Sequence, residues 1–339
     1  MTASYSADSL WWDGGFRSGG TLRVSGDGGV AVASSSEPAG SGDLVRRLPG
    51  TLLPGLVDAH VHAALVDLPT LRAGGLAGVW DLGGVPAQLA GLRGRPGMPR
   101  LRYAGPFLIP PGGYPSDRAW APRGSWREIR SAADGAEAVE EVRAGGATLV
   151  KVTAHAGGPL LPQPTLAAVV AAAHDAGLPV VVHAEGPGTV AAAVEAGADW
   201  LAHTPWTEPL DAGLARECAA RTGWISTLDI HGWGTPTAEL GTAVANLRLF
   251  RSFGGRVRYG TDLGNGPLPP AINPREIRGL QAAGLTPDDV LAAMTEHTGV
   301  SWVPGGLDLD PDRFADVLAT ARVLSPGPDH RTPLRGSQQ

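Results

Sequence analysis

Lysine is almost absent from this chain: Lys151 is the only one, although lysine and arginine together number 27 among 339 residues. The other basic side chains are therefore arginines, which keep their charge, whereas a buried lysine readily loses its proton. Lys151 lies in the apolar run 149–152, where loss of solvation is expected to lower its pKa. A neutral amine there is a candidate nucleophile or, after reaction with carbon dioxide, a candidate metal-binding carbamate. The alternative interpretation is a chance survivor of the compositional bias.

Other absences exclude whole classes of protein. The single cysteine, Cys218, excludes an internal disulfide framework and is typical of a reducing compartment. The first ten residues lack a basic segment followed by an apolar one, and no apolar run reaches the roughly 18 residues of a membrane span. The net charge of −6 offers no basic surface for nucleic acid. We expect a cytoplasmic protein with a small-molecule substrate and neither nucleic acid nor membrane as partner; a homo-oligomer stays open.

What is present is an alternation of strands and helices. Residues 1–53 contain short alternating apolar segments separated by Gly, Asp and Ser, which predict a small β unit. From residue 54 onward, apolar runs alternate with alanine-rich helical patterns such as 165–176, 188–196 and 237–253. Eight such runs predict the strands of a (β/α)8 barrel of the TIM type. They span residues 56–62, 78–82, 101–109, 148–153, 179–183, 200–203, 224–230 and 256–261.

A doubly wound sheet is the competing α/β fold. It predicts a glycine-rich phosphate-binding loop after the first strand, where this chain has Ala-His-Val-His at 59–62. We therefore predict a barrel over 54–303 and a small β-sandwich domain formed by 1–53 and 304–324. Residues 287–297 are expected to form a helix and 314–323 a strand of the small domain. Residues 325–339 are expected to be a disordered tail.

Candidate metal ligands gather at the ends of the predicted strands. His60 and His62 end the first strand and, because strand side chains alternate with a period of two, project from the same face. His183 and His203 end the fifth and sixth strands, and Asp262 follows the eighth. Active sites of such barrels lie at the carboxyl ends of the strands. Four of the nine histidines thus fall where a metal site is expected.

The segments that carry these residues resemble the metal-binding motifs of the amidohydrolase superfamily. They are PGLVDAHVH at 54–62, LVKV at 149–152, VHAEG at 182–186, LAH at 201–203 and GTD at 260–262. The flanking GVWDLGG at 78–84 and VKVTAHAG at 150–157 resemble the prolidase-like and imidazolonepropionase-like branch. The resemblance implies a binuclear site: His60, His62 and Asp262 on one metal, His183 and His203 on the other, and carbamylated Lys151 between them.

The implied ligands suit two zinc ions, with manganese, cobalt or iron as alternatives. A metal pair can ionise a bridging water and polarise a carbonyl, and Asp262 is the candidate acid and base that moves the proton. We therefore expect a hydrolase of amide C–N bonds in N-acyl amino acids, dipeptides or cyclic amides. The alternatives are a lactonase, esterase or deaminase on the same barrel, and a catalytically silent scaffold.

Candidate substrate contacts lie in the loops that follow the strands. His231 is the first candidate for polarising the substrate carbonyl, and a surface histidine is the alternative. Tyr114 and Arg118 are candidates for a substrate carboxylate, although the abundance of arginine favours a solvated loop residue at Arg118. Glu185 is a candidate partner that orients a metal ligand. His155, Trp206 and Trp233 are further candidates for the pocket wall, with loop packing as the alternative. His174, His297 and His330 lie away from the strand ends and are expected to be structural or exposed.

Overall fold

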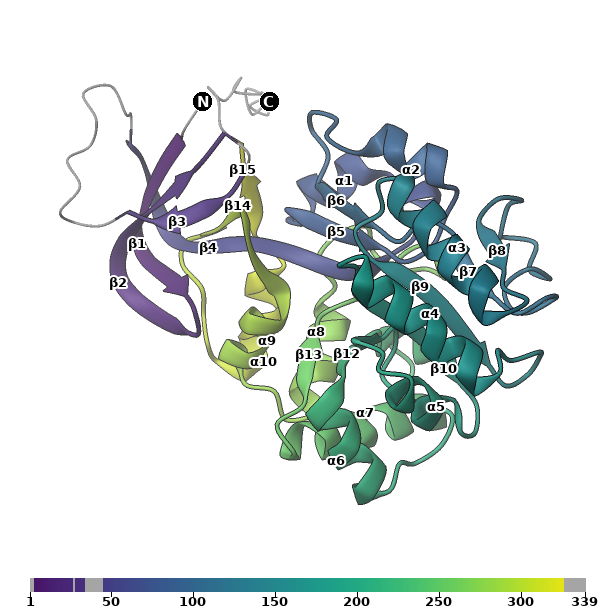
Figure 1. Cartoon of the computed structure of the whole chain (residues 1–339). Coiled ribbons are helices and arrows are strands. Elements are labelled where there is room, and N and C mark those ends of the chain that lie inside the picture. The colour runs from purple at the N-terminus through teal and green to yellow at the C-terminus, as the bar shows by residue number, and fades with distance from the viewer. Residues whose placement is uncertain (1–2, 27, 34–44, 326–339) are drawn as a thin grey trace, which may run out of the picture.

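The computed structural model describes residues 3–26, 28–33 and 45–325. It consists of a small β unit and an α/β barrel, joined by the long strand β4 (Val45–Val61), as Figure 1 shows. Strand β4 therefore belongs to both units, and the predicted boundary at residue 54 falls inside it. The predicted fold class, a (β/α)8 barrel with a β unit from both chain ends, is confirmed.

The small unit is a sheet to which both chain ends contribute. Its strand order is β15-β14-β4-β1-β2-β3, and the tight turn Asp13-Gly14 joins β1 to β2 with both residues at positive φ (47° and 84°), as a two-residue hairpin requires. Leu10, Leu22 and Leu52 are fully buried in its core. The strands other than β4 are β1 (Ala3–Trp12), β2 (Gly15–Val24), β3 (Val30–Val32), β14 (Thr295–Pro304) and β15 (Arg322–Leu324).

The end of β4 is also the first strand of the barrel. The barrel closes where Ala59 N donates to Tyr259 O at 2.9 Å and His62 N donates to Leu263 O at 2.8 Å. The remaining strands are parallel and follow in the order β5 (Gly78–Asp81), β6 (Arg100–Tyr103) with β7 (Phe107–Ile109), β9 (Val150–His155), β10 (Val180–Glu185), β11 (Trp200–Leu201), β12 (Gly223–Ile225) and β13 (Arg256–Arg258). Strand β8 (Trp126–Glu128) pairs with the outer side of β7.

Three predicted barrel strands are shorter or broken. The run 101–109 divides into β6 and β7 because Gly105 takes a positive φ of 73° and Pro106 has no N–H to donate. The run 224–230 ends as a strand at Ile225, and Thr227 adopts a left-handed φ of 46°. The run 256–261 is a regular strand only to Arg258. The chain thus leaves regular strand geometry close to His203 and Asp262.

Helices cover the outside of the barrel. They are α1 (Leu68–Ala73), α2 (Pro86–Leu92), α3 (Ala132–Ala144), α4 (Gln163–Asp175), α5 (Thr189–Glu195), α6 (Ala212–Arg221), α7 (Ala238–Ser252), α8 (Pro274–Ala282), α9 (Pro287–Met294) and α10 (Pro311–Leu318), with the 3-10 turns η1 (Ala63–Leu65) and η2 (Asp229–His231). The predicted helices 165–176, 188–196 and 237–253 are confirmed to within two residues as α4, α5 and α7. No helix among the described residues has the length and apolarity to cross a bilayer.

The C-terminal part was predicted incorrectly. Residues 314–323 form the end of α10 and only then the short strand β15, and the helix predicted to reach residue 297 ends at Met294. The Asp310 side chain caps α10 by accepting from Asp312 N, and Phe314 and Leu318 bury one face of the helix. Strand β14, placed almost wholly in the predicted barrel, pairs with β4 in the small sheet. The predicted tail 325–339 lies, except for Ser325, outside the described residues.

Candidate active site

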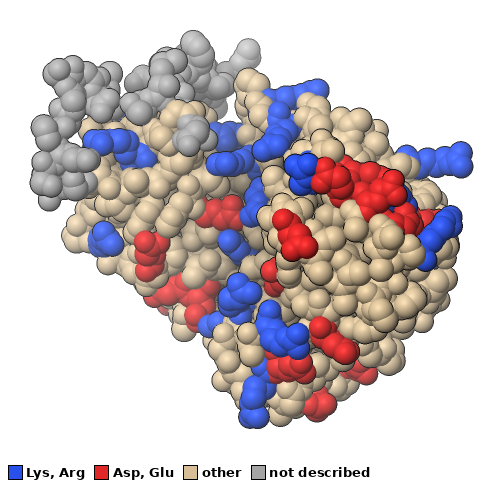
Figure 2. All heavy atoms as spheres, viewed as in Figure 1, with Lys and Arg blue, Asp and Glu red and all other residues tan. Residues whose placement is uncertain are grey.

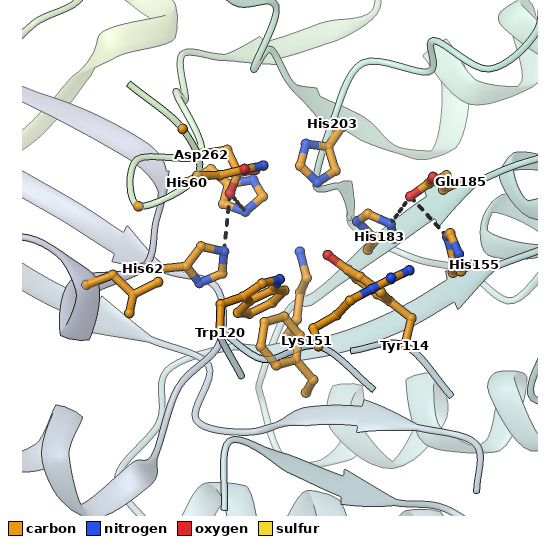
Figure 3. Close-up of a pocket in the computed structure, with 16 residues that line it drawn as sticks. His60, His62, Tyr114, Trp120, Lys151, His155, His183, Glu185, His203 and Asp262 are labelled. Atoms are coloured by element: carbon orange, nitrogen blue, oxygen red, sulfur yellow. Dashed lines mark hydrogen bonds and ion pairs between the residues drawn. The ribbon is translucent and has the colours of Figure 1, made fainter. Parts of the chain in front are cut away.

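Buried polar side chains converge at the carboxyl ends of the barrel strands (Figure 3). His60 lies near the end of β4 and His183 in β10, while His203 and Asp262 follow β11 and β13. The ligand atoms of His60, His203 and Asp262 lie within 4.8 Å of one another. The His183 and His203 rings are 4.9 Å apart between centroids. The structure therefore brings together the residues that the sequence assigned to a metal site.

In each of the four imidazoles one ring nitrogen is engaged by the protein. His60 Nδ1 is 2.8 Å from Ala202 O, and His62 Nδ1 is 3.1 Å from Gly83 O. His203 Nδ1 is 2.8 Å from Thr227 Oγ1. His183 uses its other nitrogen, Nε2, which is 2.9 Å from Glu185 Oε2. The remaining nitrogens, His60 Nε2, His62 Nε2, His203 Nε2 and His183 Nδ1, are left as electron-pair donors, as in metal sites where a second partner fixes each imidazole.

The Asp262 carboxylate lies against two of these free nitrogens. Its Oδ1 is 3.1 Å from His60 Nε2 and 3.2 Å from His62 Nε2, yet this buried oxygen makes no contact with the geometry of a hydrogen bond. Oδ2 accepts from Asn265 Nδ2 at 2.9 Å. Asp262 also has a positive φ of 57°, an uncommon conformation that turns its side chain toward the histidines. Lone-pair donors that meet without bonding to one another fit the ligand set of a cation.

Lys151 enters the site from below the level of the histidines. It is the second residue of β9 and pairs with Val181, whereas His183 pairs with Thr153, two residues further along. Its long side chain, 2% exposed, reaches up toward the space between His62 and His183 (Figure 3). The Lys151 amine makes no hydrogen bond or ion pair with another described residue. A buried amine in this place, without a partner among the described residues, fits the bridging position that the resemblance implies for Lys151.

Burial sets the protonation of these groups. It lowers the pKa of His60 to about 4 and the pKa of His203 well below its usual value, so both rings are neutral, the form in which imidazole binds a metal. Burial likewise lowers the pKa of Lys151 to about 7, although Asp262 and Asp81 oppose this effect. Burial opposes ionisation of Asp262, but His60 and His62 hold its pKa well below the usual range. At His62 burial also opposes the charged form, but the contact with Asp262 outweighs it and raises the pKa of this ring. The site thus offers a carboxylate, neutral imidazoles at His60 and His203, and a partly neutral amine.

Glu185 links two histidines on one side of the site. Its Oε2 lies 2.9 Å from His183 Nε2 and 3.0 Å from His155 Nδ1. Glu185 was predicted to orient a metal ligand, and the contact with His183 places it to do so. His155 lies in the wall of the cavity and makes only this polar contact through Nδ1.

The cavity above the metal-ligand candidates has a volume of about 460 Å3. One wall is aromatic: the Tyr114 ring lies 5.1 Å from His183 and 6.1 Å from Trp120, and Phe107 lies 6.1 Å from Trp120. The Thr153 hydroxyl donates to Tyr114 O at 2.8 Å and anchors this loop to β9. Arg118, with its guanidinium 5.4 Å from the Tyr114 ring centroid, is the lining residue with a fixed positive charge.

Several lining residues were not predicted from the sequence. They are Leu65, Phe107, Trp120, Gly264, Asn265 and Gly266. Leu65 and Trp120 are 48% and 41% exposed, so two large apolar side chains face solvent at the mouth of the cavity. No motif signals them, because Phe107 is one apolar residue of a strand and the others lie in turns and loops whose place depends on the completed barrel.

Three predicted substrate contacts lie outside the cavity lining. Trp206 packs against two histidine rings, with centroid distances of 5.3 Å to His203 and 4.9 Å to His231. His231 Nε2 is buried without a hydrogen-bond partner among the described residues. Trp233 is 44% exposed and covers Gly266 at the rim. This arrangement favours positioning roles for Trp206 and His231 over direct contact with a substrate.

His174 and His297 lie away from the site, as predicted. His174 Nε2 is 2.9 Å from Asp199, and His297 Nε2 is 2.9 Å from Asp13. His330 falls outside the described residues.

Comparison with known proteins identifies structures that share this fold. No family model matches the chain, and no curated protein matches its sequence. Among solved structures, a Xaa-Pro dipeptidase with bound methionine matches with a TM-score of 0.73 at 17% identity, over 95% of this chain and 97% of the other. Ochratoxinase from A. niger matches with a TM-score of 0.77 at 16% identity, over 95% and 94% of the two chains. Phenylurea hydrolase B gives 0.72 at 18% identity, over 95% of both. The structural neighbours are prolidase-like amidohydrolases, and the chain has their fold along nearly its whole length.

Proposed function

We propose that the protein is a metal-dependent hydrolase of amide C–N bonds. The observation that carries this proposal is the set of four imidazoles, each with one nitrogen held by the protein. The other nitrogens of His60 and His62 face Asp262, and His203 offers a nitrogen within 4.8 Å of the same ligand group. A buried core cluster that served only packing would leave no such donors unpaired. The fold shared with a dipeptidase, an ochratoxinase and a phenylurea hydrolase supports the choice of reaction class.

The donor set fits two divalent cations. His60, His62 and Asp262 would hold one, His183 and His203 the other, and a carbamate on Lys151 would bridge them. Imidazole with carboxylate oxygen suits zinc, and also manganese, cobalt or iron. When bound, such a pair supplies a Lewis acid and a water of lowered pKa.

The protein's own groups would then complete the reaction. Asp262 takes up the proton of the attacking water and returns it to the leaving nitrogen. Tyr114 presents its hydroxyl toward the same space as the Lys151 amine (Figure 3), and burial raises its pKa, so the hydroxyl stays a hydrogen-bond donor for the substrate carbonyl. Arg118 at the rim is positioned to bind a substrate carboxylate through its guanidinium fork.

The cavity walls favour an amide that carries an aromatic or other apolar group. Phe107, Tyr114 and Trp120 provide flat apolar surface, and the volume of about 460 Å3 suits a small molecule. With Arg118 at the rim, an N-acyl amino acid, a dipeptide or a cyclic amide with a free carboxylate matches this lining. An ester or lactone of the same shape is the alternative substrate.

Metal analysis of the purified protein and of Lys151→Ala tests the proposal. We expect about two metals per wild-type chain, loss of metal and activity in Lys151→Ala, and partial rescue by acetate or propionate, which replace the carbamate oxygens. Two metals and full activity in the variant without added acid would rule out the bridge. One metal per wild-type chain would favour a deaminase, and none a silent scaffold.

Matched substrates test the type of bond that is cleaved and the role of the aromatic cavity wall. N-acetylphenylalanine should be hydrolysed faster than its primary amide, which lacks the carboxylate, and faster than N-acetylalanine, which lacks the ring. In Trp120→Ala the preference for phenylalanine over alanine should fall about tenfold, the scale of one aromatic contact. Faster cleavage of the matching ester or lactone would move the assignment to an esterase or lactonase.

A further inference from the structure

A second and larger cavity lies at the opposite end of the barrel from the proposed active site. It has a volume of about 950 Å3 and lies between the starts of the barrel strands and the small sheet. Leu101 and Thr148 line it from the amino ends of β6 and β9, and Thr298 lines it from β14. Figure 2 shows basic side chains gathered where the two units meet.

The lining of this groove is strongly basic although the chain is acidic. Among the described residues it contains one carboxylate, that of Glu296, and five guanidinium groups, those of Arg72, Arg93, Arg95, Arg100 and Arg102. We call these five the arginine groove. Glu296 is already shared, since Oε1 accepts from Trp80 Nε1 at 3.0 Å and lies 3.5 Å from the Arg258 guanidinium. It also lies 3.9 Å from Arg102, and among the described residues no carboxylate pairs with the other four arginines.

The guanidiniums are held in place by uncharged acceptors. Arg72 donates to Ser325 Oγ at 3.0 Å, Arg100 to Thr298 Oγ1 at 2.8 Å and Arg93 to Gly146 O at 3.2 Å. The Arg102 guanidinium lies 4.4 Å from the Trp80 ring centroid. Within the described part of the chain, none of Arg72, Arg93, Arg95 and Arg100 forms an ion pair. Arg72, Arg93 and Arg100 are thus oriented by uncharged groups, and no carboxylate of the described residues compensates their charge.

Two members of the groove are partly withdrawn from water. Burial lowers the pKa of Arg72 and of Arg102, and Arg258 and Arg100 add like-charge repulsion at Arg102. At Arg102 the Glu296 carboxylate opposes this effect, whereas Arg72 has no carboxylate partner among the described residues. Partly desolvated cations that lie close together destabilise one another, and a bound anion would remove this cost.

We propose that the arginine groove binds a small polyphosphate of about the size of a nucleoside triphosphate. Guanidinium groups bind phosphate oxygens in pairs, and several forks facing one space match several linked phosphates better than one carboxylate. The volume admits such a molecule, whereas the net charge of −6 gives no extended basic track for a long nucleic acid. The site lies away from the metal ligands, so the proposal does not rest on the hydrolase function.

Isothermal titration of the metal-loaded protein with tripolyphosphate and with ATP, without magnesium and at fixed ionic strength, tests the proposal. We expect saturable binding of both, weakened about tenfold or more in Arg95→Gln/Arg100→Gln through the loss of charge-assisted hydrogen bonds. Binding tighter for ATP than for tripolyphosphate would indicate that the nucleoside is also recognised; equal binding would assign the site to the phosphates alone. If the first variant folds poorly, Arg93→Gln/Arg95→Gln takes its place. It alters only exposed side chains and should also weaken the binding of tripolyphosphate and ATP.

Two controls distinguish binding in the arginine groove from binding elsewhere on the protein. Arg17→Gln/Arg216→Gln removes two positive charges elsewhere and should change the affinity less than about twofold. Lys151→Ala should retain full affinity, because the groove lies at the other end of the barrel. Loss of binding in Lys151→Ala would assign the anion to the metal centre, and equal weakening in the charge control would show only non-specific attraction. Either result, or no binding by the wild type, would overturn the proposal.

Discussion

Asp58 and Thr261, 203 residues apart in the sequence, are joined by a buried hydrogen bond of 2.6 Å between Thr261 Oγ1 and Asp58 Oδ2. The other oxygen of Asp58 accepts from Thr261 N at 3.1 Å and from His60 N at 3.0 Å. One carboxyl group therefore fixes the backbone on both sides of the barrel closure. Because Thr261 precedes Asp262, the same group sets the relative position of the His60 and Asp262 side chains.

Removing the Thr261 hydroxyl should weaken the contacts that close the barrel. Thr261→Val leaves a buried carboxyl group with one partner fewer, and we expect the free energy of unfolding to fall by about 1–3 kcal/mol, with faster loss of metal. Urea denaturation and metal dissociation into a chelator measure the two effects. Thr222→Val is the matched control, since Thr222 is also buried but its hydroxyl makes only a 3.3 Å contact with the adjacent Gly223 O. Equal behaviour of the two variants would contradict the proposed role of Asp58.

The pKa of Lys151 predicts how metal loading depends on pH. Carbamate formation joins the neutral amine nitrogen to carbon dioxide with loss of a proton, and with a pKa of about 7 the neutral fraction of Lys151 falls about tenfold from pH 8 to pH 6. At constant dissolved carbon dioxide, metal-free protein should therefore regain activity with added metal about ten times more slowly at pH 6. Lys151→Ala rescued with propionate lacks the amine and reports the contribution of histidine protonation. An identical pH dependence of the two proteins would exclude the carbamate as its cause.

Glu185 should act on one metal position and not on the other. Glu185→Gln keeps the shape of the side chain but weakens its hold on His183, and loss of such a partner lowers metal affinity by about 10- to 100-fold. We expect the metal content to fall toward one per chain, because His60, His62 and Asp262 do not contact Glu185. Glu195→Gln, on the exposed end of the next helix, should retain both metals. Loss of both metals in Glu185→Gln would indicate that the two positions are not independent.

The barrel and the convergence of the candidate metal ligands were predictable because they follow local periodicities. His60 and His62 share a face through the two-residue repeat of a strand, and the parallel strands bring their carboxyl ends to one side. The hydrogen-bond partners of these ligands were not predictable, since Thr227 and Thr261 are ordinary residues until the closed barrel places them against His203 and Asp58. Trp120 was missed for a similar reason: it reaches the cavity from a loop without periodicity.

The segment that forms helix α10 was wrongly predicted to be a strand. Phe314, Ala315 and Leu318 suggested a strand as part of an apolar run, but Asp310 and Pro311 provide a helix start, and the three apolar residues lie on one helical face. The start signal outweighed the apolar content of the segment.

Tyr114 and His231 give different predictions for the group that polarises the substrate carbonyl. Among the described residues Tyr114 lines the cavity, whereas His231 does not and packs against Trp206, with 4.9 Å between the ring centroids. Tyr114→Phe should therefore lower kcat about 100-fold with little change in KM, the scale found when one donor to a developing oxyanion is removed. His231→Asn should lower kcat less than about tenfold, through a shift of Trp206. Steady-state kinetics with one amide substrate, on proteins matched for metal content, distinguishes the two. A larger loss in His231→Asn than in Tyr114→Phe would return the role to His231 and require the loop after β12 to move toward the cavity when substrate binds.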